Sequence, residues 1–343
     1  MCSGKPSESG AVLILVLIVL AGLAVLAVEF NRDALQDHML SVSSRSVLSS
    51  RPLLDAGEIA ASSALCGPFS KEKFDDGKAP WEHLDEGLAL LSRELKSGEL
   101  SGKLEDEHAL FPLRSLIPTR KTDRARAESC QRIFVRLVAR ELLDAGAAED
   151  EMQAEELAEA FRDSLMQWSG LLTVDKESQE WYLQQMPRRM PPGRPPFSLE
   201  ELLLVRWPGL EPEKARLVLE GTEEKPGLLR LFSIVAPGPM NIDTLHPDIV
   251  EALSMDRMLG KQLARQVEEL RRYPDKTAEG DWHKELFEMY DVPPMPAGCV
   301  DKGSRWFRLT QKARVGGREN VRISIGWIGG GSVRWEYRWS VGN

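Results

Sequence analysis

The sequence predicts an α+β protein with a hydrophobic helix near its N-terminus. Three observations predict this class: an unbroken apolar run, a long middle with apolar residues at helical spacing, and a C-terminal segment of alternating apolar and polar residues. The chain has 343 residues, enough for one large or two modest cores beyond the N-terminal helix.

The apolar run covers residues 11–28 (AVLILVLIVLAGLAVLAV) and contains no charged or polar side chain. As a helix it extends about 27 Å, close to the thickness of the hydrocarbon core of a bilayer. A cleaved secretory signal, a plain membrane anchor and a helix released by cleavage on its N-terminal side all remain open. A secretory signal is disfavoured because the run is long and the following residues, 29–32, form a poor cleavage site.

A short polar leader, residues 1–10, precedes the run and ends at Gly10, directly before Ala11. This layout resembles a type IV prepilin-like leader, in which a peptidase cuts after the glycine. The leader has one base, Lys5, so its positive-inside signal is weak.

Residues 29–65 turn polar but keep apolar side chains at helical spacing, with no glycine before Gly57. We expect an amphipathic stem that packs on a globular head, kinked or interrupted at Pro52.

Further helices are expected at residues 81–100, 130–145 and 154–172, with a turn and short extended pieces at 101–118. The segment 185–197 contains five prolines and is predicted to be an extended connector.

Two related helical units follow. In the first, Ser198 and Glu201 have capping-box spacing, and a helix leads to the hairpin Pro208-Gly209-Leu210 and a second helix. The second unit, from residue 240 to 272, repeats this plan. Both are similar to helix-hairpin-helix elements.

Helix-hairpin-helix pairs often bind DNA backbones, so a membrane-anchored DNA-binding or DNA-uptake protein is the alternative function. Residues 197–230 hold seven acids and five bases, residues 241–276 hold seven acids and six bases, and the whole chain carries a net charge of −9. Without a positive field phosphate binding loses its main driving force, so we expect a structural or protein-contacting module and no nucleic-acid partner.

The segments 321–328 and 332–341 alternate with period two and are separated by glycine turns, which predicts an antiparallel meander with one buried face. From residue 302 onward nine bases stand against two acids, so the exposed face is basic and is either solvated or docks an acidic partner. In the last strand, the expected buried side chains are Val333, Trp335, Tyr337, Trp339 and Val341, and the expected exposed ones are Arg334, Glu336, Arg338 and Ser340.

No residue qualifies as a nucleophile or general base, and the sequence lacks zinc-site spacings and phosphate-binding glycine motifs, so we expect no enzyme. The cysteines are Cys2, Cys66, Cys130 and Cys299. Cys2 leaves with the leader, and one disulfide among the other three is possible, but the sequence does not select its partners.

Four stretches together resemble the K-type minor pseudopilin of type II secretion systems (general secretion pathway protein K). The N-x-N-T turn of that family corresponds here to Asn241-Ile242-Asp243-Thr244, with Asp243 in place of the second asparagine. The four stretches are the Gly10/Ala11 boundary with its apolar helix, RPPFSLEELLLVRWPGL (194–210), LFSIVAPGPMNIDTLHPDIVEAL (231–253) and SRWFRLTQKARV (304–315).

The resemblance implies a pilin-like antiparallel sheet head interrupted by a large helical insertion with helix-hairpin-helix (SAM-like) units. The implied divisions are a prepilin-type leader (1–10), a transmembrane helix (11–28), a stem helix with the first part of the head (29–120), the inserted α-helical domain (121–296) and the C-terminal strands of the head (297–343).

The resemblance also implies a role and a location. The protein would be a substrate of prepilin peptidase, held in the bacterial inner membrane by one helix with its head in the periplasm. It would initiate or cap the pseudopilus at its tip for protein export, together with I- and J-type minor pseudopilins.

Within the membrane helix, which includes Gly22, the fifth mature residue is Leu15. Most pilins carry a glutamate there, and K-type members characteristically lack it, as a tip subunit can. Family members can bind calcium through an acidic run. Here the run is reduced to residues 163–168 with one carboxylate, so calcium is possible by resemblance only and no residue is assigned as a ligand.

Overall fold

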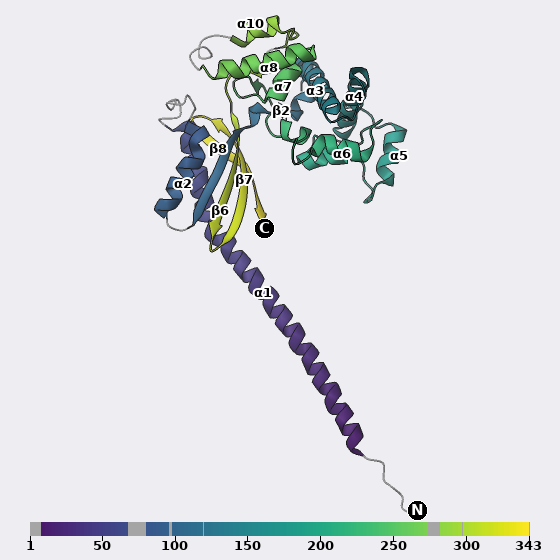
Figure 1. Cartoon of the computed structure of the whole chain (residues 1–343), viewed down its shortest axis with the longest axis vertical. Coiled ribbons are helices and arrows are strands. Elements are labelled where there is room, and N and C mark those ends of the chain that lie inside the picture. The colour runs from purple at the N-terminus through teal and green to yellow at the C-terminus, as the bar shows by residue number, and fades with distance from the viewer. Residues whose placement is uncertain are drawn as a thin grey trace, which may run out of the picture.

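The computed structural model describes residues 8–67, 80–95, 98–118, 120–273, 282–296 and 298–342. Figure 1 shows a long N-terminal helix, a sheet that packs on the end of that helix, and a group of helices beside one end of the sheet. The predicted leader, residues 1–10, lies mostly outside the described residues.

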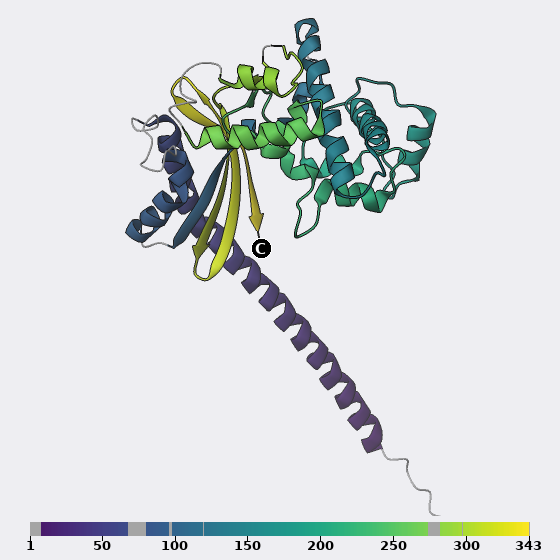
Figure 2. The ribbon, with the colours of Figure 1, turned by 45° about the horizontal axis from the view of Figure 1, so that its top comes forward.

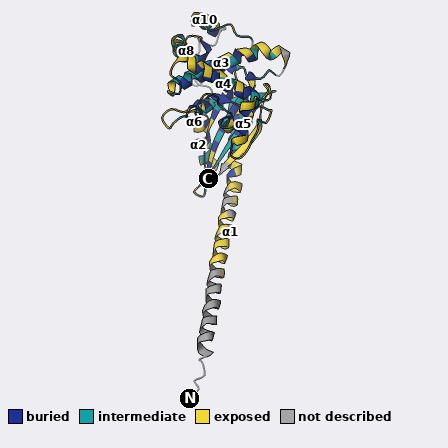
Figure 3. Ribbon diagram, turned by 90° about the vertical axis from the view of Figure 1, so that its right-hand side faces the viewer, coloured by how far each residue is buried: buried dark blue, intermediate teal, exposed yellow. Residues whose placement is uncertain are grey.

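Helix α1 (Glu8–Cys66) runs without a break through Pro52, so the expected interruption there was wrong. Proline cannot donate a hydrogen bond to the carbonyl of Leu48, and Leu48 is 67% exposed, so this part of the helix is open to solvent. In Figure 3 the described residues of α1 that lie outside the head are mostly exposed.

No helix is long and apolar enough to cross a membrane among the residues whose side chains are described. The predicted membrane segment, 11–28, lies outside those residues except at Leu26 and Val28.

A four-stranded antiparallel sheet receives the end of α1. Its order is β1 (Glu99–Asp106), β6 (Trp306–Val315), β7 (Arg318–Gly329) and β8 (Ser332–Gly342), and this confirms the α+β class. Residues 99 and 100, expected at the end of a helix, begin β1, because α2 (Leu84–Leu95) ends earlier. One face of the sheet packs against α1 and α2 through buried side chains that include Leu53, Leu88, Leu100, Leu309 and Ala313.

Gly57 allows α1 to lie close to the sheet. A Cβ atom at this position would lie 2.1 Å from Nε2 of the buried Gln311 on β6. The first glycine of the predicted stem therefore marks the contact between helix and sheet.

A β-bulge in β8 places on opposite faces of the sheet the apolar residues that the sequence predicts on one face. Ile325 pairs with Tyr337 but Gly326 pairs with Trp335, so Glu336 is an extra residue. Trp335 consequently turns toward α1, whereas Tyr337 and Trp339 point to the other face and stay 41% and 43% exposed. The expectation of a single buried face was wrong for these residues, because the bulge shifts the alternation by one.

Between the neighbouring strands β1 and β6 the chain forms a helical region (Figure 2). This region has its own apolar cluster. Two short parallel pairs lie at its base: β2 (Phe111–Pro112) with β3 (Phe232–Ser233), and β4 (Met240–Asn241) with β5 (Val300–Asp301). The helices are α3 (Arg124–Asp144), α4 (Glu151–Trp168), α5 (Lys176–Gln184), α6 (Pro212–Glu220), α7 (Pro247–Leu253), α8 (Arg257–Arg271) and α10 (Trp282–Met289).

The predicted capping box at Ser198 was wrong. The six residues after it, Leu199–Leu204, form a 3₁₀-helix, and the Ser198 side chain makes no capping hydrogen bond. Glu201 instead accepts two hydrogen bonds from Arg194, at 3.1 and 3.2 Å, and the Arg194 guanidinium lies 3.7 Å from the ring centre of Phe197. A charged, two-point partner outcompetes a single backbone N–H for the Glu201 carboxylate.

Candidate functional site

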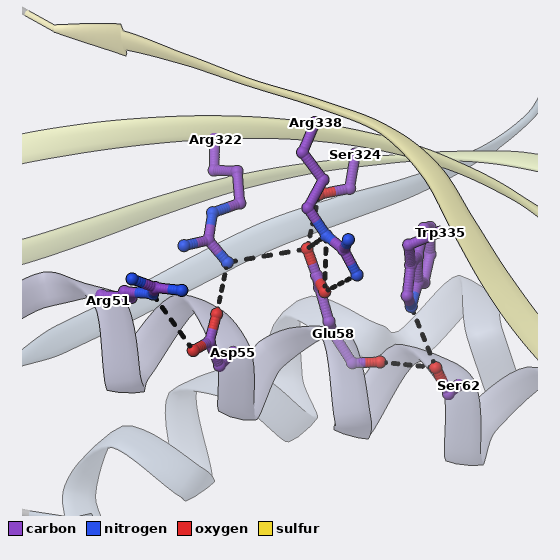
Figure 4. A network of polar contacts seen from close by, with 8 residues as sticks. All are labelled: Arg51, Asp55, Glu58, Ser62, Arg322, Ser324, Trp335 and Arg338. Atoms are coloured by element: carbon purple, nitrogen blue, oxygen red, sulfur yellow. Dashed lines mark hydrogen bonds and ion pairs between the residues drawn. The ribbon is translucent and has the colours of Figure 1, made fainter.

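Glu58 on α1 is the centre of a polar network that fastens this helix to the sheet (Figure 4). Its carboxylate is buried and accepts hydrogen bonds from Nε and Nη2 of Arg338 at 2.9 and 3.0 Å and from Oγ of Ser324 at 2.7 Å. These bonds to Glu58 raise the pKa of the Arg338 guanidinium. The residue that the alternation placed on the exposed basic face therefore binds the N-terminal helix.

A second ion pair extends the network by one helical turn. Nη1 of Arg322 on β7 lies 2.6 Å from Oδ1 of Asp55 and 3.6 Å from Oε1 of Glu58. On the other side, Nε1 of Trp335 donates to Oγ of Ser62 at 3.1 Å. Together these residues line an open groove of about 550 Å³ between α1 and the two last strands.

Beyond this network, α1 carries apolar side chains that the head does not cover. Phe30 is 75% exposed, and the others in this group are between 51% and 67% exposed. The group comprises Leu26, Val28, Phe30, Leu35, Met39, Val47 and Leu48, and we call it the uncovered helix surface. A group of exposed apolar side chains of this kind indicates a site of contact with a membrane or a protein.

The predicted turn Asn241-Asp243-Thr244 lies where the helical region meets the sheet. Asp106, at the end of β1, accepts hydrogen bonds through Oδ2 from Nδ2 of Asn241 at 3.2 Å and from the hydroxyls of Thr244 and Ser304. Oδ1 of Asn241 accepts from the backbone N–H groups of Asp243 and Gly303, both at 3.1 Å. The Asp243 carboxylate does not take part in these bonds. We call this arrangement the junction node.

The next residue, Glu107, makes a similar connection between the sheet and the helical region. It is 1% exposed, accepts a hydrogen bond from the Ser233 hydroxyl on β3 and lies 2.6 Å from Nε of Arg308 on β6. Two consecutive acids at the end of β1 thus join the sheet to two separate strands of the helical region. Buried charges of this kind require partners, so both contacts fix the position of the two parts.

The hairpin Pro208-Gly209-Leu210 packs on α4. The preceding Trp207 ring stacks on Phe161 with centroids 4.1 Å apart, and its Nε1 donates to the Leu157 carbonyl at 2.8 Å. Gly209 has φ +77°, and a Cβ there would lie 3.0 Å from Leu157. The close approach to α4 gives this glycine a packing role.

The turn between α7 and α8, which corresponds to the second predicted hairpin, is held by arginines of α3. Nε of Arg136 donates to the Ala252 carbonyl at 2.7 Å, and Nη2 of Arg140 donates to the Ser254 carbonyl at 3.1 Å. Burial, with the charges of Arg140 and Arg132, lowers the pKa of Arg136 to about 10. These cations are committed to protein carbonyls, which favours the structural interpretation of the helical units.

The acidic run at 163–168 does not fit a calcium site, which needs six to eight oxygen ligands. Its one carboxylate, Asp163, already accepts a hydrogen bond from Nε of Arg162 at 2.9 Å, and Leu165, Met166 and Trp168 are buried. Among the described residues no group of three or more His, Cys, Asp or Glu side chains is placed to hold a metal.

The structure thus brings Asn241 and Thr244 into one node and places Pro208-Gly209-Leu210 against α4. Gly10, Ala11, Leu15 and Gly22 fall within α1, in the part whose side chains are not described. Sequence reasoning missed Glu58 and Asp106, the two acids at the centres of the networks. An acid at a helix position facing the predicted core, as at Glu58, was the available signal for one of them.

The comparisons with known proteins give one kind of match. No family model and no curated protein matches the chain. Among solved structures, the chain is similar to a chain in the crystal structure of the GspK-GspI-GspJ complex from the enterotoxigenic Escherichia coli Type 2 Secretion System. The TM-score is 0.53 at 18% sequence identity, and the match covers 88% of this chain and 99% of that chain. This likeness shows a shared fold, in agreement with the resemblance to K-type minor pseudopilins.

Proposed function

We propose that this protein is a K-type minor pseudopilin of a type II secretion system. The observation that carries the proposal is the division of α1 into a part fastened to the sheet by Glu58 and a longer part with an uncovered helix surface. A helix of this kind serves assembly, because its exposed apolar side chains need a bilayer or neighbouring helices to cover them. The shared fold supports the same function.

In this proposal the leader is cleaved between Gly10 and Ala11 by prepilin peptidase. The apolar run then holds the protein in the bacterial inner membrane, with the sheet and helical region in the periplasm, until α1 enters the pseudopilus. Leu15 supports a place at the tip, because a subunit with no subunit above it has no N-terminal amine to neutralise.

The proposed partners are the other minor pseudopilins of the I and J types, with which this chain would initiate or cap the pseudopilus. The similar solved chain belongs to a GspK-GspI-GspJ complex of a Type 2 Secretion System. The uncovered helix surface is the part of this chain that we expect to contact them.

The first experiment determines the mature N-terminus after co-expression with a prepilin peptidase. We expect Ala11 as the first residue, and a Gly10→Val variant that keeps Met1. Wild-type protein that also begins at Met1 in the presence of active peptidase would contradict the proposal.

The second experiment measures co-purification with I- and J-type partners from detergent extracts. Phe30→Ser and Leu35→Ser should reduce the recovered partner, because each removes an exposed apolar side chain of α1. Asp37→Ser is the matched control, since it changes an exposed polar position of the same helix and should keep full recovery. Equal recovery for all three variants would exclude this helix as the contact.

A further inference from the structure

Two cysteines meet at the base of the helical region. Cys130 lies on α3, which follows the sheet strand β1, and Cys299 directly precedes β5, through which the chain returns to the sheet. They are 1% and 2% exposed, and their thiols are hydrogen-bonded to each other. Because 168 residues lie between them, the two thiols enclose almost the entire helical region.

The backbone holds Cys299 against α3. Sγ of Cys299 lies 3.9 Å from the carbonyl oxygen of Arg126, one helical turn before Cys130, and its own carbonyl accepts a hydrogen bond from the Met240 amide at 2.9 Å. A Cβ at Gly298 would lie 3.6 Å from the Arg126 side chain, so this loop packs directly on α3. The pairing is therefore set by the packing of the loop and by β4.

We propose that Cys130 and Cys299 form a disulfide when the chain folds in the presence of a disulfide oxidant, and that this bond closes the helical region at its base. Cys66 is not a competing partner, since it ends α1 within the sheet part of the molecule and belongs to neither side of this contact.

The reaction is a thiol–disulfide exchange in two steps. While the chain is still folding, the thiolate of one cysteine attacks the oxidant disulfide and releases one oxidant sulfur as a thiol. The thiolate of the other cysteine then attacks the sulfur of the first cysteine in the mixed disulfide and releases the second oxidant sulfur. The two cysteines lose two protons and two electrons, and the oxidant gains both as two thiol groups.

The two thiols differ in pKa once the chain is folded. The hydrogen bond from Cys130 and the charges of Arg126 and Arg132 lower the pKa of Cys299, whereas the pKa of Cys130 is raised by its bond to Cys299 and by burial. Since both sulfurs are buried in the folded chain, we expect oxidation during folding and slow reaction afterwards.

The test refolds the reduced, denatured full chain in detergent with a mixture of oxidised and reduced glutathione, blocks remaining thiols and maps tryptic peptides without reduction. We expect the peptide of residues 127–132 to be joined to the peptide of residues 285–302, while the Cys66 peptide, 46–71, carries the blocking group. Cys66→Ser should keep the joined peptide, and Cys130→Ser should abolish it. Refolded protein in which peptides 127–132 and 285–302 are both blocked, or joined to 46–71, would overturn the pairing.

The inference rests on the proposed function only for the compartment that supplies the oxidant. A second arm therefore isolates the chain from cells whose thiols are blocked at lysis. A joined peptide supports both the pairing and a periplasmic head. A disulfide that forms on refolding but is absent from the chain isolated from cells supports the pairing and contradicts the periplasmic location.

Discussion

Replacing Glu58 by alanine tests whether the polar network fastens α1 to the sheet. The change removes the acceptor of two Arg338 hydrogen bonds and of the Ser324 hydroxyl, which is fully buried. Arg322 keeps its contact with Asp55 at 2.6 Å, so only part of the network loses its partner.

The expected loss of free energy depends on how far each partner of Glu58 is buried. Breaking a fully buried ion pair costs about 3–5 kcal/mol, and orphaning a buried hydroxyl costs about 1–3 kcal/mol. The Arg338 side chain is 50% exposed and regains water when Glu58 is lost, which removes most of the ion-pair part. We expect a loss of about 2–3 kcal/mol in the free energy that keeps this part of α1 on the sheet.

Amide hydrogen exchange measures that free energy locally. A loss of about 2–3 kcal/mol increases the exchange rate of α1 amides around residues 53–62 by about 30- to 150-fold. Amides of α3 should not change. Glu29→Ala is the matched control, because it removes the same side chain from an exposed position of the same helix. Rates in Glu58→Ala within about twofold of this control would refute the reasoning and assign the attachment of α1 to apolar contacts alone.

Three further perturbations test the helical region and the junction. Trp207→Ala should lower the unfolding free energy by about 3–5 kcal/mol, because the ring stacks 4.1 Å from an aromatic ring of α4; an unchanged urea midpoint would contradict this. Asn241→Ala should cost about 1–3 kcal/mol, since Asp106 loses a buried donor, and faster exchange of the β4 amides is the readout. The Ser178 amide and its other donors lower the pKa of Asp175 from 3.8 to about 2, so the stability contributed by Asp175 is complete above its unfolded pKa and disappears as the pH falls from about 4 to 2. Asp175→Asn should flatten acid unfolding in that window, and an unchanged pH profile would show that this carboxylate is not linked to folding.

The sequence predicted features that depend on residues close together in the chain. Apolar residues at helical spacing located the ends of α4 to within four residues and those of α3 to within six, and period-two alternation located β7 and β8. Five prolines placed the connector at 185–197 outside regular structure, as observed. These signals are local, so neighbouring residues suffice to read them.

Where the predictions failed, a contact or an irregularity outside the pattern had changed the local preference. The capping box at Ser198 had the correct spacing, but Arg194 takes the Glu201 carboxylate. The alternation of β8 was correct on each side of Glu336, but the bulge there reverses the faces of the residues that follow. Neither the competing arginine nor the bulge is encoded in the pattern itself.

By itself, the sequence determined the α+β class, the positions of most helices and strands, and the turn of residues 241–244 as a point of interest. Only the tertiary structure showed that this turn binds Asp106, 135 residues earlier, that Glu58 meets Arg338, and that Cys130 meets Cys299. The physical reason is that hydrogen bonding and burial depend on distance in space. Residues far apart in the sequence become neighbours only when the chain folds, as when β1 pairs with β6 across the long insertion, and no local pattern relates them.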